Sequence, residues 1–401
     1  MNRVAITGIG VISALGQNTQ AMSTALKSGK SAIGPLTVMP TDDLLVKIGA
    51  EVSNFDPKAH FDDRHLSLLD RCAQFALVAA REAISASGLN FRGELGAHSA
   101  AIVGSGVGGM RTLDESFRRL YAEGAKRFHP LTIPKMMISA PVSHITMENG
   151  IKGPAFTVAS ACASANHAIG IAFQMVRAGV VDVAVTGGTE SVFTLGTLKA
   201  WEAMRILAPD TCRPFSRGRK GLTLGEGAGI FVLENFARAK ARGAEILGEI
   251  AGFGMSSDAE DIVLPSLDGA TSAMRACVAD SGLSLEEFEY INAHGTGTTM
   301  NDVTESRAIR ALFGSHADRL AVSSTKSMHG HALGAAGAIE LAATLLAMRD
   351  GFIPPTANFI ETDPDCDLDY VPNVTRNAQF NIAMSNSFAF GGLNAVLAVR
   401  R

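Results

Sequence analysis

The chain repeats itself, and this repetition limits the folds that it can adopt. The stretch AITGIG at residues 5–10 returns as EIAGFG at residues 249–254. The Ala-rich segment at residues 168–179 returns at residues 338–351, so the two echoes occur in the same order. Chance similarity accounts for one match between Ala-rich helices, whereas two matches in the same order favour a duplicated unit. We therefore predict two related halves, residues 1–245 and 246–401, which meet at a charged stretch.

Short runs rich in β-branched residues alternate with longer apolar helical patterns along the chain. This alternation predicts an α/β fold in which buried sheets lie between helical layers. The 41 glycines, against one Trp and three Tyr, indicate close backbone packing rather than aromatic cores. Gly8 and Gly10 are predicted to form a turn after the first strand. The predicted strands are 4–7, 99–104, 181–186 and 228–234, and the predicted helices are 73–87, 163–179 and 237–243.

The composition excludes several classes of protein. The chain has 401 residues, of which 47% are hydrophobic, and a net charge of −4, so a large core is expected and nucleic acid is not an expected partner. No uninterrupted apolar run reaches the about 18–20 residues of a membrane helix, so no membrane insertion is expected. The five cysteines are widely spaced without a CxxC pair, which supports neither a zinc site nor a disulfide framework. A reducing, cytoplasmic location fits this pattern.

Cys162 is the candidate nucleophile. It lies in the small-residue run VASACASA at residues 158–165, directly before an apolar helical pattern. A cysteine at a helix N-terminus has its thiolate stabilised by the helix dipole and by free backbone N–H groups, so we expect a thiol of low pKa. The alternative is that Cys162 is a small buried hydrophobe, but the close packing of Ala, Ser and Gly around it favours the nucleophile.

Two histidines in Gly-rich settings complete a pattern typical of covalent catalysis. His294 lies in NAHGTGT at residues 292–298, and His331 lies in KSMHGHALG at residues 326–334. Lys326, in the same segment as His331, stands among Ser, Thr, Met and Gly, which predicts burial rather than a solvated surface charge, and a buried lysine needs a partner. His329 stands two positions before His331 and has no role in this pattern.

These motifs, in this order, resemble the β-ketoacyl-acyl-carrier-protein synthases of the KAS I/KAS II type, closer to KAS II, within the thiolase-fold superfamily. The resemblance covers essentially the whole chain. It implies a five-layered α-β-α-β-α fold built from two duplicated halves, and a homodimer. The motifs that carry it are RVAITGIG at 3–10, the run around Cys162, GGTE at 187–190, CRPF at 212–215, GEGA at 225–228, the run around His294, STKS at 324–327, GHALGAAG at 330–337 and NSFAFGG at 386–392.

The resemblance also implies an activity. It is the decarboxylative Claisen condensation of an acyl group on Cys162 with malonyl-acyl-carrier protein, which extends an acyl chain by two carbons in fatty acid biosynthesis. The backbone amides of Cys162 and Phe390 would form the oxyanion hole, and His294 and His331 would stabilise the enolate oxygen. No cofactor or metal is expected, because the substrates are carried on the phosphopantetheine of acyl carrier protein.

Further roles follow from the resemblance alone. Lys326 is expected to pair with Glu340, and Glu305 to support the His294 loop, although a helix-start role for Glu305 is equally compatible with the sequence. Phe390 would act as a gate, but Ala389 and Leu393 depart from the residues usual at their positions, which puts the mobility of the gate in doubt. Val107 and Ile133 are expected in the acyl pocket, and Lys126, Arg127 and Arg205 in the docking site for carrier protein.

Other functions remain open at this point. A specialised ketosynthase of polyene, polyketide or nodulation-type lipid biosynthesis, with a partner subunit that lacks the cysteine, is suggested by the segment 201–214 and by Ala389 and Leu393. A non-catalytic chain-length subunit is disfavoured because the nucleophile is present. A cysteine hydrolase would need one histidine oriented by Asn or Asp, and a biosynthetic thiolase would need a second cysteine within residues 386–394, where there is none.

Overall fold

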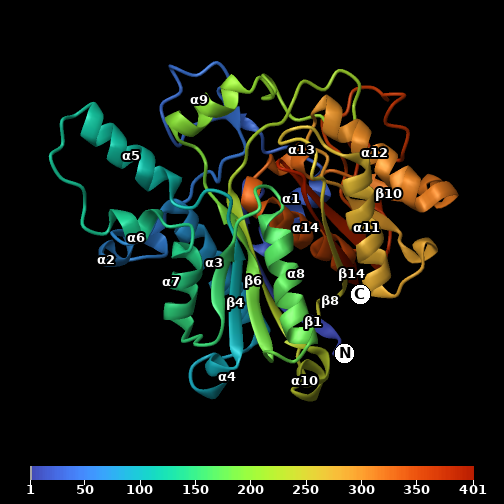
Figure 1. The fold of residues 1–401 in the computed structure, drawn as a ribbon, viewed down its shortest axis with the longest axis horizontal. Helices are drawn as coiled ribbons and strands as arrows, with labels where there is room; N and C mark the ends of the chain where they lie inside the picture. The colour runs from blue at the N-terminus through green and yellow to red at the C-terminus, as the bar shows by residue number, and fades with distance from the viewer. Residues whose placement is uncertain (1) are drawn as a thin grey trace.

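The computed structural model describes residues 2–401. Besides two small two-stranded sheets, it has one twisted sheet of ten strands, which divides into two sets of five (Figure 1). The sets are joined only where Val4–Ile6 pair with residues 248–250. In spatial order the first set is β1 (Val4–Ser13), β7 (Gly227–Asn235), β6 (Val183–Glu190), β4 (Ser99–Gly104) and β5 (Ala155–Val158). The second set is β8 (Gly248–Ser257), β14 (Leu393–Arg400), β13 (Ile382–Ala389), β9 (Tyr290–Asn292) and β10 (Ala321–Ser323).

The two sets have the same topology. In each, the strand that comes first along the chain pairs with the fifth, and the fifth with the fourth, in both cases antiparallel. The fourth then pairs with the second, and the second with the third, in parallel. This match confirms that the fold consists of two duplicated halves. The division at residues 245 and 246 stays a prediction; β8 begins at Gly248.

Helices separate and cover the two sets of strands in five layers, which run from left to right in Figure 1. An outer layer of α3 (Arg71–Ser87) and α7 (Ala140–Asn149) covers the first set. In the middle, α8 (Ser164–Arg177) and α14 (Ala336–Asp350) contact strands of both sets and each other. The last layer contains α11 (Leu267–Ser281) and α12 (Thr299–Phe313). The predicted five-layered α/β fold is therefore confirmed.

The central helices explain why the sequence pattern is so apolar. Every residue of α14 from Ala336 to Met348 is buried, so this helix has no polar face. A helix that is hydrophobic all round must lie inside the protein. Its N-terminus and that of α8 follow the segments that carry His331 and Cys162. Among the helices of residues 2–401, none is long and apolar enough to cross a membrane.

The predicted turn at Gly8 and Gly10 is wrong, because β1 continues to Ser13. A Cβ atom on Gly8 would lie 2.0 Å from the Ala83 carbonyl oxygen, and one on Gly10 would lie 1.9 Å from that of Ala79. The glycines are therefore needed for close contact between β1 and α3 and not for a turn. In the second half, Gly252 and Gly254 make the same close approach to α11.

Most predicted elements lie within a few residues of their observed bounds. Helix 73–87 is α3, which begins at Arg71, and strand 99–104 is β4. The helix predicted from residue 163 is α8, which begins at Ser164 and is preceded by the turn that carries Cys162. Strands 181–186 and 228–234 correspond to β6 and β7, and helix 237–243 corresponds to α10 (Phe236–Ala241).

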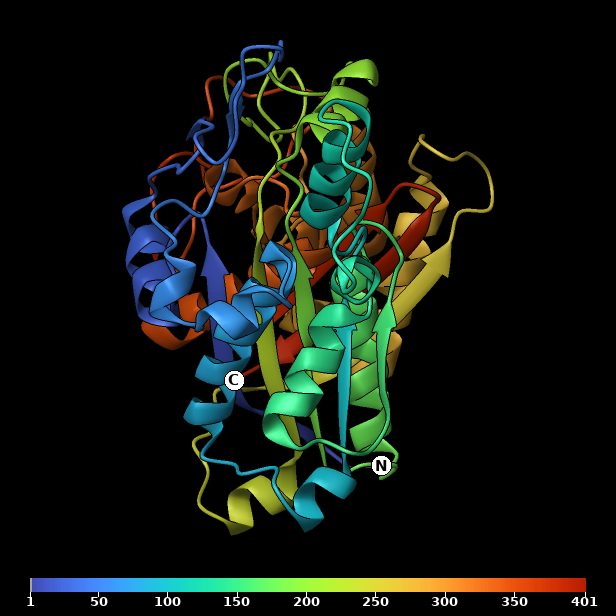
Figure 2. The ribbon, with the colours of Figure 1, turned by 90° about the vertical axis from the view of Figure 1, so that its left-hand side faces the viewer.

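A small lobe projects from this body. It consists of α5 (Met110–Tyr121) and α6 (Thr132–Met136), which lie at the left edge in Figure 1 and face the viewer in Figure 2. No residue of α5 is buried. The lobe exposes a set of large apolar side chains, which we call the α5–α6 face: Phe117, Tyr121, Phe128, Ile133 and Met137.

We predict that Gly10→Ala destabilises the protein, because its methyl group would overlap the Ala79 carbonyl of α3. Overpacking of this kind costs about 1–3 kcal/mol. The measurement is the free energy of unfolding in urea. Gly34→Ala is the control, because no atom lies within 4 Å of a Cβ at Gly34. Equal stability of the two variants would contradict the packing role of Gly10.

Candidate active site

One cavity gathers the residues expected to carry the chemistry. It has a volume of about 390 Å³ and lies between the two halves. Cys162 comes from the turn before α8, His294 from the loop after β9, and His331 from the segment before α14. Phe390 and Trp201 form part of its wall. The fold thus brings residues that are distant in the sequence together around one cavity.

Cys162 lies on a strained turn between β5 and α8. Ala161 has a φ of 48°, in the left-handed region that alanine rarely adopts. The Ser164 side chain holds this turn, since its hydroxyl accepts from the Ser160 N–H at 2.9 Å and donates to the Ala161 carbonyl at 2.6 Å. A Cβ on Gly104 would lie 2.4 Å from the Ser164 backbone, so β4 approaches the turn closely. The turn presents the sulfur at the cavity.

The expected low pKa of Cys162 is not found. Burial raises the pKa of this thiol to about 11, and the negative charge of Glu190 acts in the same direction. The Lys326 ammonium and the backbone N–H groups of Phe390 and of Cys162 itself oppose the rise. Removal of the sulfur from water therefore outweighs the groups that stabilise the thiolate. The free protein holds a protonated thiol with two N–H donors directed at it.

The His294 loop is fixed by a buried carboxylate. Glu305, in the second turn of α12, accepts hydrogen bonds from the N–H groups of His294 and Gly295, both at 2.8 Å. Asn386 on β13 donates to the same carboxylate at 3.0 Å. Glu305 is therefore not a helix-start residue, because α12 begins at Thr299. Its contacts show how the second half positions one histidine.

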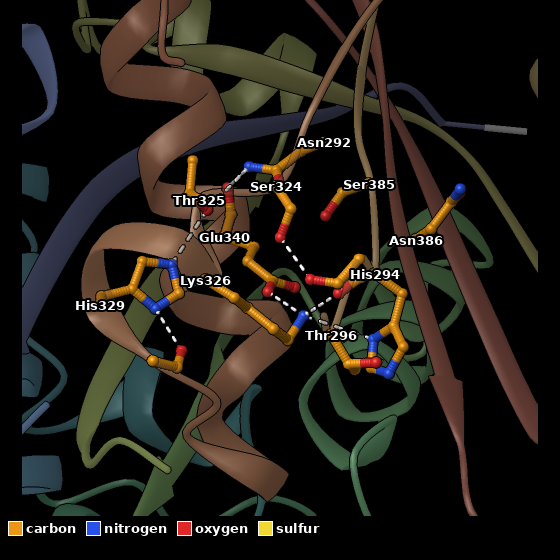
Figure 3. A network of polar contacts seen from close by, with 12 residues as sticks. Asn292, His294, Thr296, Ser324, Thr325, Lys326, His329, Glu340, Ser385 and Asn386 are labelled. Atoms are coloured by element: carbon orange, nitrogen blue, oxygen red, sulfur yellow. Dashed lines mark hydrogen bonds and ion pairs between the residues drawn. The ribbon is translucent and has the colours of Figure 1, made fainter. Parts of the chain in front are cut away.

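Lys326 is completely buried and finds three acceptors, as Figure 3 shows. Its ammonium forms an ion pair with Glu340 of α14 and donates to the His294 carbonyl oxygen at 2.6 Å. It also lies 3.4 Å from His294 Nδ1. Because an ammonium can only donate, Nδ1 is the acceptor in this contact. The remaining ring nitrogen, Nε2, therefore carries the hydrogen.

Both histidines are neutral at physiological pH. Burial lowers the pKa of His294 and that of His331 well below 6.5, and the positive charge of Lys326 lowers both further. The two rings lie 5.4 Å apart, nearly perpendicular to each other. His331 Nδ1 has no hydrogen-bond partner in the described chain. A neutral imidazole is both an N–H donor and a weak base, so each ring can stabilise an oxyanion without bringing a charge of its own.

His329 stays outside this arrangement, as the sequence suggested. Its ring is buried, its Nδ1 lies 2.9 Å from the Gly330 carbonyl and its Nε2 lies 2.9 Å from the Thr325 hydroxyl (Figure 3). It does not line the cavity. These two contacts are with the residues that flank α13 (Lys326–His329).

Phe390 closes the cavity beside Cys162. It follows β13, and its backbone N–H is directed at the sulfur. Gly391 and Gly392, with φ of 81° and 67°, form the tight connection to β14. Ala389 is the last residue of β13 and pairs with Leu393 across the hairpin. This position has regular strand geometry, so it does not need a glycine.

Comparison with known proteins decides the family. The model of the β-ketoacyl synthase N-terminal domain matches residues 1–239, and that of the C-terminal domain matches residues 247–360. Nodulation protein E of Rhizobium sp. (strain N33) is 48% identical over 100% of this chain and 99% of the relative. The 3-oxoacyl-[acyl-carrier-protein] synthase 2 of Staphylococcus aureus (strain N315) is 38% identical over 100% and 98%. The chain belongs to the β-ketoacyl synthase family.

Solved structures agree with this assignment. The ishigamide ketosynthase/chain length factor superposes with a TM-score of 0.94 at 37% identity, covering 100% of this chain and 99% of that one. A type II polyketide ketosynthase in complex with its acyl-carrier protein gives a TM-score of 0.90 at 28% identity, with the same coverage. The protein is therefore an acyltransferase-type enzyme of the thiolase fold, a β-ketoacyl-acyl-carrier-protein synthase.

Some predicted site residues of this ketosynthase lie outside the cavity. Arg205 lines it, whereas Lys126 and Arg127 lie on the loop between α5 and α6. Val107 and Ile133, expected in the acyl pocket, are 37% and 62% exposed and do not line it either. No group of three or more His, Cys, Asp or Glu side chains within residues 2–401 is arranged to hold a metal ion.

Sequence reasoning assigned no site role to several residues of the cavity wall, of which Trp201 contacts Phe390. The Trp201 indole stacks on the Phe390 ring, with centroids 6.1 Å apart. Trp201 is the only tryptophan of the chain, and this was the signal available. It lies in α9 (Leu195–Ala203), which is distant in the sequence from Phe390, so the contact between the two rings depends on the fold.

We predict that alkylation of Cys162 by iodoacetamide accelerates about tenfold per pH unit between pH 7 and pH 10, because only the thiolate reacts and burial holds the pKa near 11. Peptide mass spectrometry follows Cys162 separately from the other cysteines, and Cys162→Ala confirms the assignment. A rate that is already constant above pH 7 would contradict the protonated resting thiol.

We predict that Lys326→Met raises the pKa of His294 and His331, because it removes the positive charge that lowers both. Diethyl pyrocarbonate modifies neutral imidazole, so the pH midpoint of modification should move upward toward 6.5 in the variant. Lys58→Met, which changes an exposed lysine beside Asp63, is the control and should leave the midpoints unchanged. Identical midpoints in wild type and Lys326→Met would show that Lys326 does not set the field around the histidines.

Proposed function

We propose that Cys162 of this ketosynthase accepts an acyl group from carrier protein and that His294 and His331 then promote its condensation with malonyl-carrier protein. The observation that carries this proposal is the meeting of one thiol, two neutral imidazoles and two backbone N–H donors in one buried cavity. This is a set of groups for handling two successive oxyanions, which a hydrolase with one histidine does not require.

In the first step the Cys162 sulfur attacks the thioester carbonyl of acyl-carrier protein. The N–H groups of Cys162 and Phe390 stabilise the oxyanion that forms. When the tetrahedral intermediate collapses, the C–S bond to the carrier breaks. The carrier leaves as a thiol, and the proton that it takes up balances the proton lost by Cys162. Because the resting thiol is protonated, its proton must leave as the substrate binds; His294 and His331 are the neutral bases in the cavity.

In the second step malonyl-carrier protein loses CO₂, and the electron pair of the broken C–C bond forms an enolate. His294 donates from Nε2 to the enolate oxygen, and His331 donates from its own N–H. The carbanion attacks the acyl carbonyl on Cys162, and the cysteine thiolate leaves. The product is a β-ketoacyl chain that is two carbons longer.

Lys326, Glu340 and Glu305 support these steps without touching substrate. Lys326 keeps both histidines neutral and fixes the His294 tautomer. Glu340 supplies the negative charge that a buried ammonium requires. Glu305 holds the backbone of the His294 loop.

The acyl pocket and the carrier site are proposed to need a second subunit. The α5–α6 face, which includes Ile133, is apolar and exposed, Val107 is also exposed, and β5 is an edge strand of the sheet. A second copy of this chain would cover these residues, and we propose a homodimer in which Val107 and Ile133 enclose the acyl chain. Lys126, Arg127 and Arg205 supply positive charge for acidic carrier protein. The five cysteines, all buried free thiols, fit a cytoplasmic location.

A second candidate is a specialised ketosynthase that works with a partner subunit lacking the cysteine. The higher identity to nodulation protein E, 48% against 38% for the synthase 2 relative, favours it. So does the likeness to a structure that pairs a ketosynthase with a chain length factor. The two candidates share their chemistry and differ in acyl substrate and partner.

We predict that the purified chain extends saturated acyl-carrier proteins with malonyl-carrier protein and that Cys162→Ala abolishes the product, because the acyl-enzyme cannot form. Mass spectrometry of carrier-bound products across short, long, saturated and polyunsaturated chains is the measurement. His98→Gln is the control, because His98 is exposed and lies outside the cavity. Extension confined to unsaturated chains, or only with an added partner subunit, would establish the specialised function. Product formation by Cys162→Ala would refute the covalent mechanism.

A further inference from the structure

Glu190 is a buried carboxylate that the proposed mechanism does not use. It ends β6 and has no exposed surface. Its Oε1 accepts from the Ser105 hydroxyl at 3.0 Å and from the Val107 N–H at 3.3 Å. Its Oε2 accepts from the N–H groups of Gly106 at 2.6 Å and Gly334 at 3.0 Å. Within residues 2–401 no lysine, arginine or histidine forms an ion pair with it.

These four donors come from two segments with different tasks. Ser105, Gly106 and Val107 belong to the glycine loop after β4, which carries the proposed wall of the acyl pocket. Gly334 lies in the turn three residues after His331, in the other half of the fold. Glu190 therefore joins the pocket wall to the segment that carries a catalytic histidine.

The backbone at Gly106 and Gly334 packs closely against Glu190. A Cβ on Gly106 would lie 2.8 Å from Glu190 Oε2, and one on Gly334 would lie 2.6 Å from the same oxygen and 2.3 Å from the Gly106 nitrogen. Only glycine permits this approach at both positions. Because three of the four donors, those of Gly106, Val107 and Gly334, are backbone N–H groups that cannot reverse their role, the site requires an acceptor between them.

The carboxylate also acts on the nucleophile. Its negative charge raises the pKa of Cys162, and it has the same effect on Cys72 of α3. The other titratable groups that bear on Cys162 are Lys326, which lowers its pKa, and the neutral His294 and His331 in the same cavity. Glu190 thus binds the pocket wall by hydrogen bonds and acts on the nucleophile through its charge.

We propose that Glu190 is a positioning residue that holds the Val107 loop against the His331 turn and so sets the acyl-pocket wall relative to Cys162. This inference rests on the proposed function, because the proposed function assigns Val107 to the pocket that encloses the acyl chain. Glu190 does not touch the reacting atoms in this scheme. It links the selection of acyl length to the geometry of the catalytic cavity.

The test is Glu190→Gln, which keeps the shape but places an NH₂ group opposite two of the donors. Hydrogen–deuterium exchange of the peptide that contains residues 104–109 should accelerate at least about threefold, because amides there lose their acceptor. Burial raises the pKa of Glu190 to about 7, so its carboxylate is ionised above that pH. In that range the alkylation of Cys162 should shift to lower pH by about 0.5 unit in Glu190→Gln, because a negative charge is removed. The ratio of long-chain to medium-chain extension should change at least about threefold. Unchanged exchange together with an unchanged length profile would overturn the proposal.

Two further variants keep the result decisive. Ser105→Ala keeps the charge but removes the hydroxyl that donates to Glu190 at 3.0 Å and accepts from the Gly108 N–H at 3.2 Å. Faster exchange at the Gly106 and Val107 amides, with altered acyl preference and an unchanged alkylation profile, is the expected result; it decides the matter if Glu190→Gln does not fold. Glu82→Gln is the matched control, because Glu82 also accepts backbone N–H groups, from Val11 and Thr19, away from the cavity. Exchange and alkylation do not require turnover, so a wild-type protein without condensing activity would refute the proposed function and leave these two readouts to judge Glu190.

Discussion

The central layer of two helices is the constraint on which the rest of the structure depends. Because α14 is buried on all sides and α8 packs beside it, the two sets of strands must close around this pair. The N-termini of both helices then lie at the interface of the halves, where Cys162 comes from the first half of the chain and His331 from the second. The active site is thus a consequence of duplicating one unit and packing the copies on their central helices.

Burial at this interface determines the electrostatics of the site. An ammonium inside a protein is costly unless it is paired and hydrogen-bonded, and Lys326 meets this condition with Glu340 and the His294 carbonyl. The same burial keeps the histidines neutral and the cysteine protonated. Since Lys326 lowers all three pKa values, one charge favours the thiolate and also prevents protonation of the imidazoles. The cavity therefore holds neutral donors at rest.

The local sequence pattern was sufficient to predict the helices, the strands and the reactive side chains. It was insufficient to predict how deeply those side chains are buried and what they contact. The periodicity of residues 73–87 and 99–104 located α3 and β4 because each carries a clear buried face. Gly8 and Gly10 were misread as a turn because the helix that packs on them is distant in the sequence. The pKa of Cys162 was misjudged because the helix N-terminus is visible in the sequence and the depth of burial is not. Glu190 stood in a motif, but its donors come from two segments that are distant from it in the sequence.

The reacting groups and the residues proposed to enclose the acyl chain lie in different parts of the structure. Cys162, His294, His331 and Lys326 are enclosed within one chain, so their geometry does not depend on what lies outside it. Val107 and Ile133 stand at the surface, so, in their proposed role, the space for the acyl chain is completed by whatever covers the α5–α6 face. A second copy and a different subunit would offer different side chains there while the reacting groups stay as they are. The same condensing chemistry can therefore serve fatty acid elongation or a specialised lipid, according to the subunit that completes the pocket.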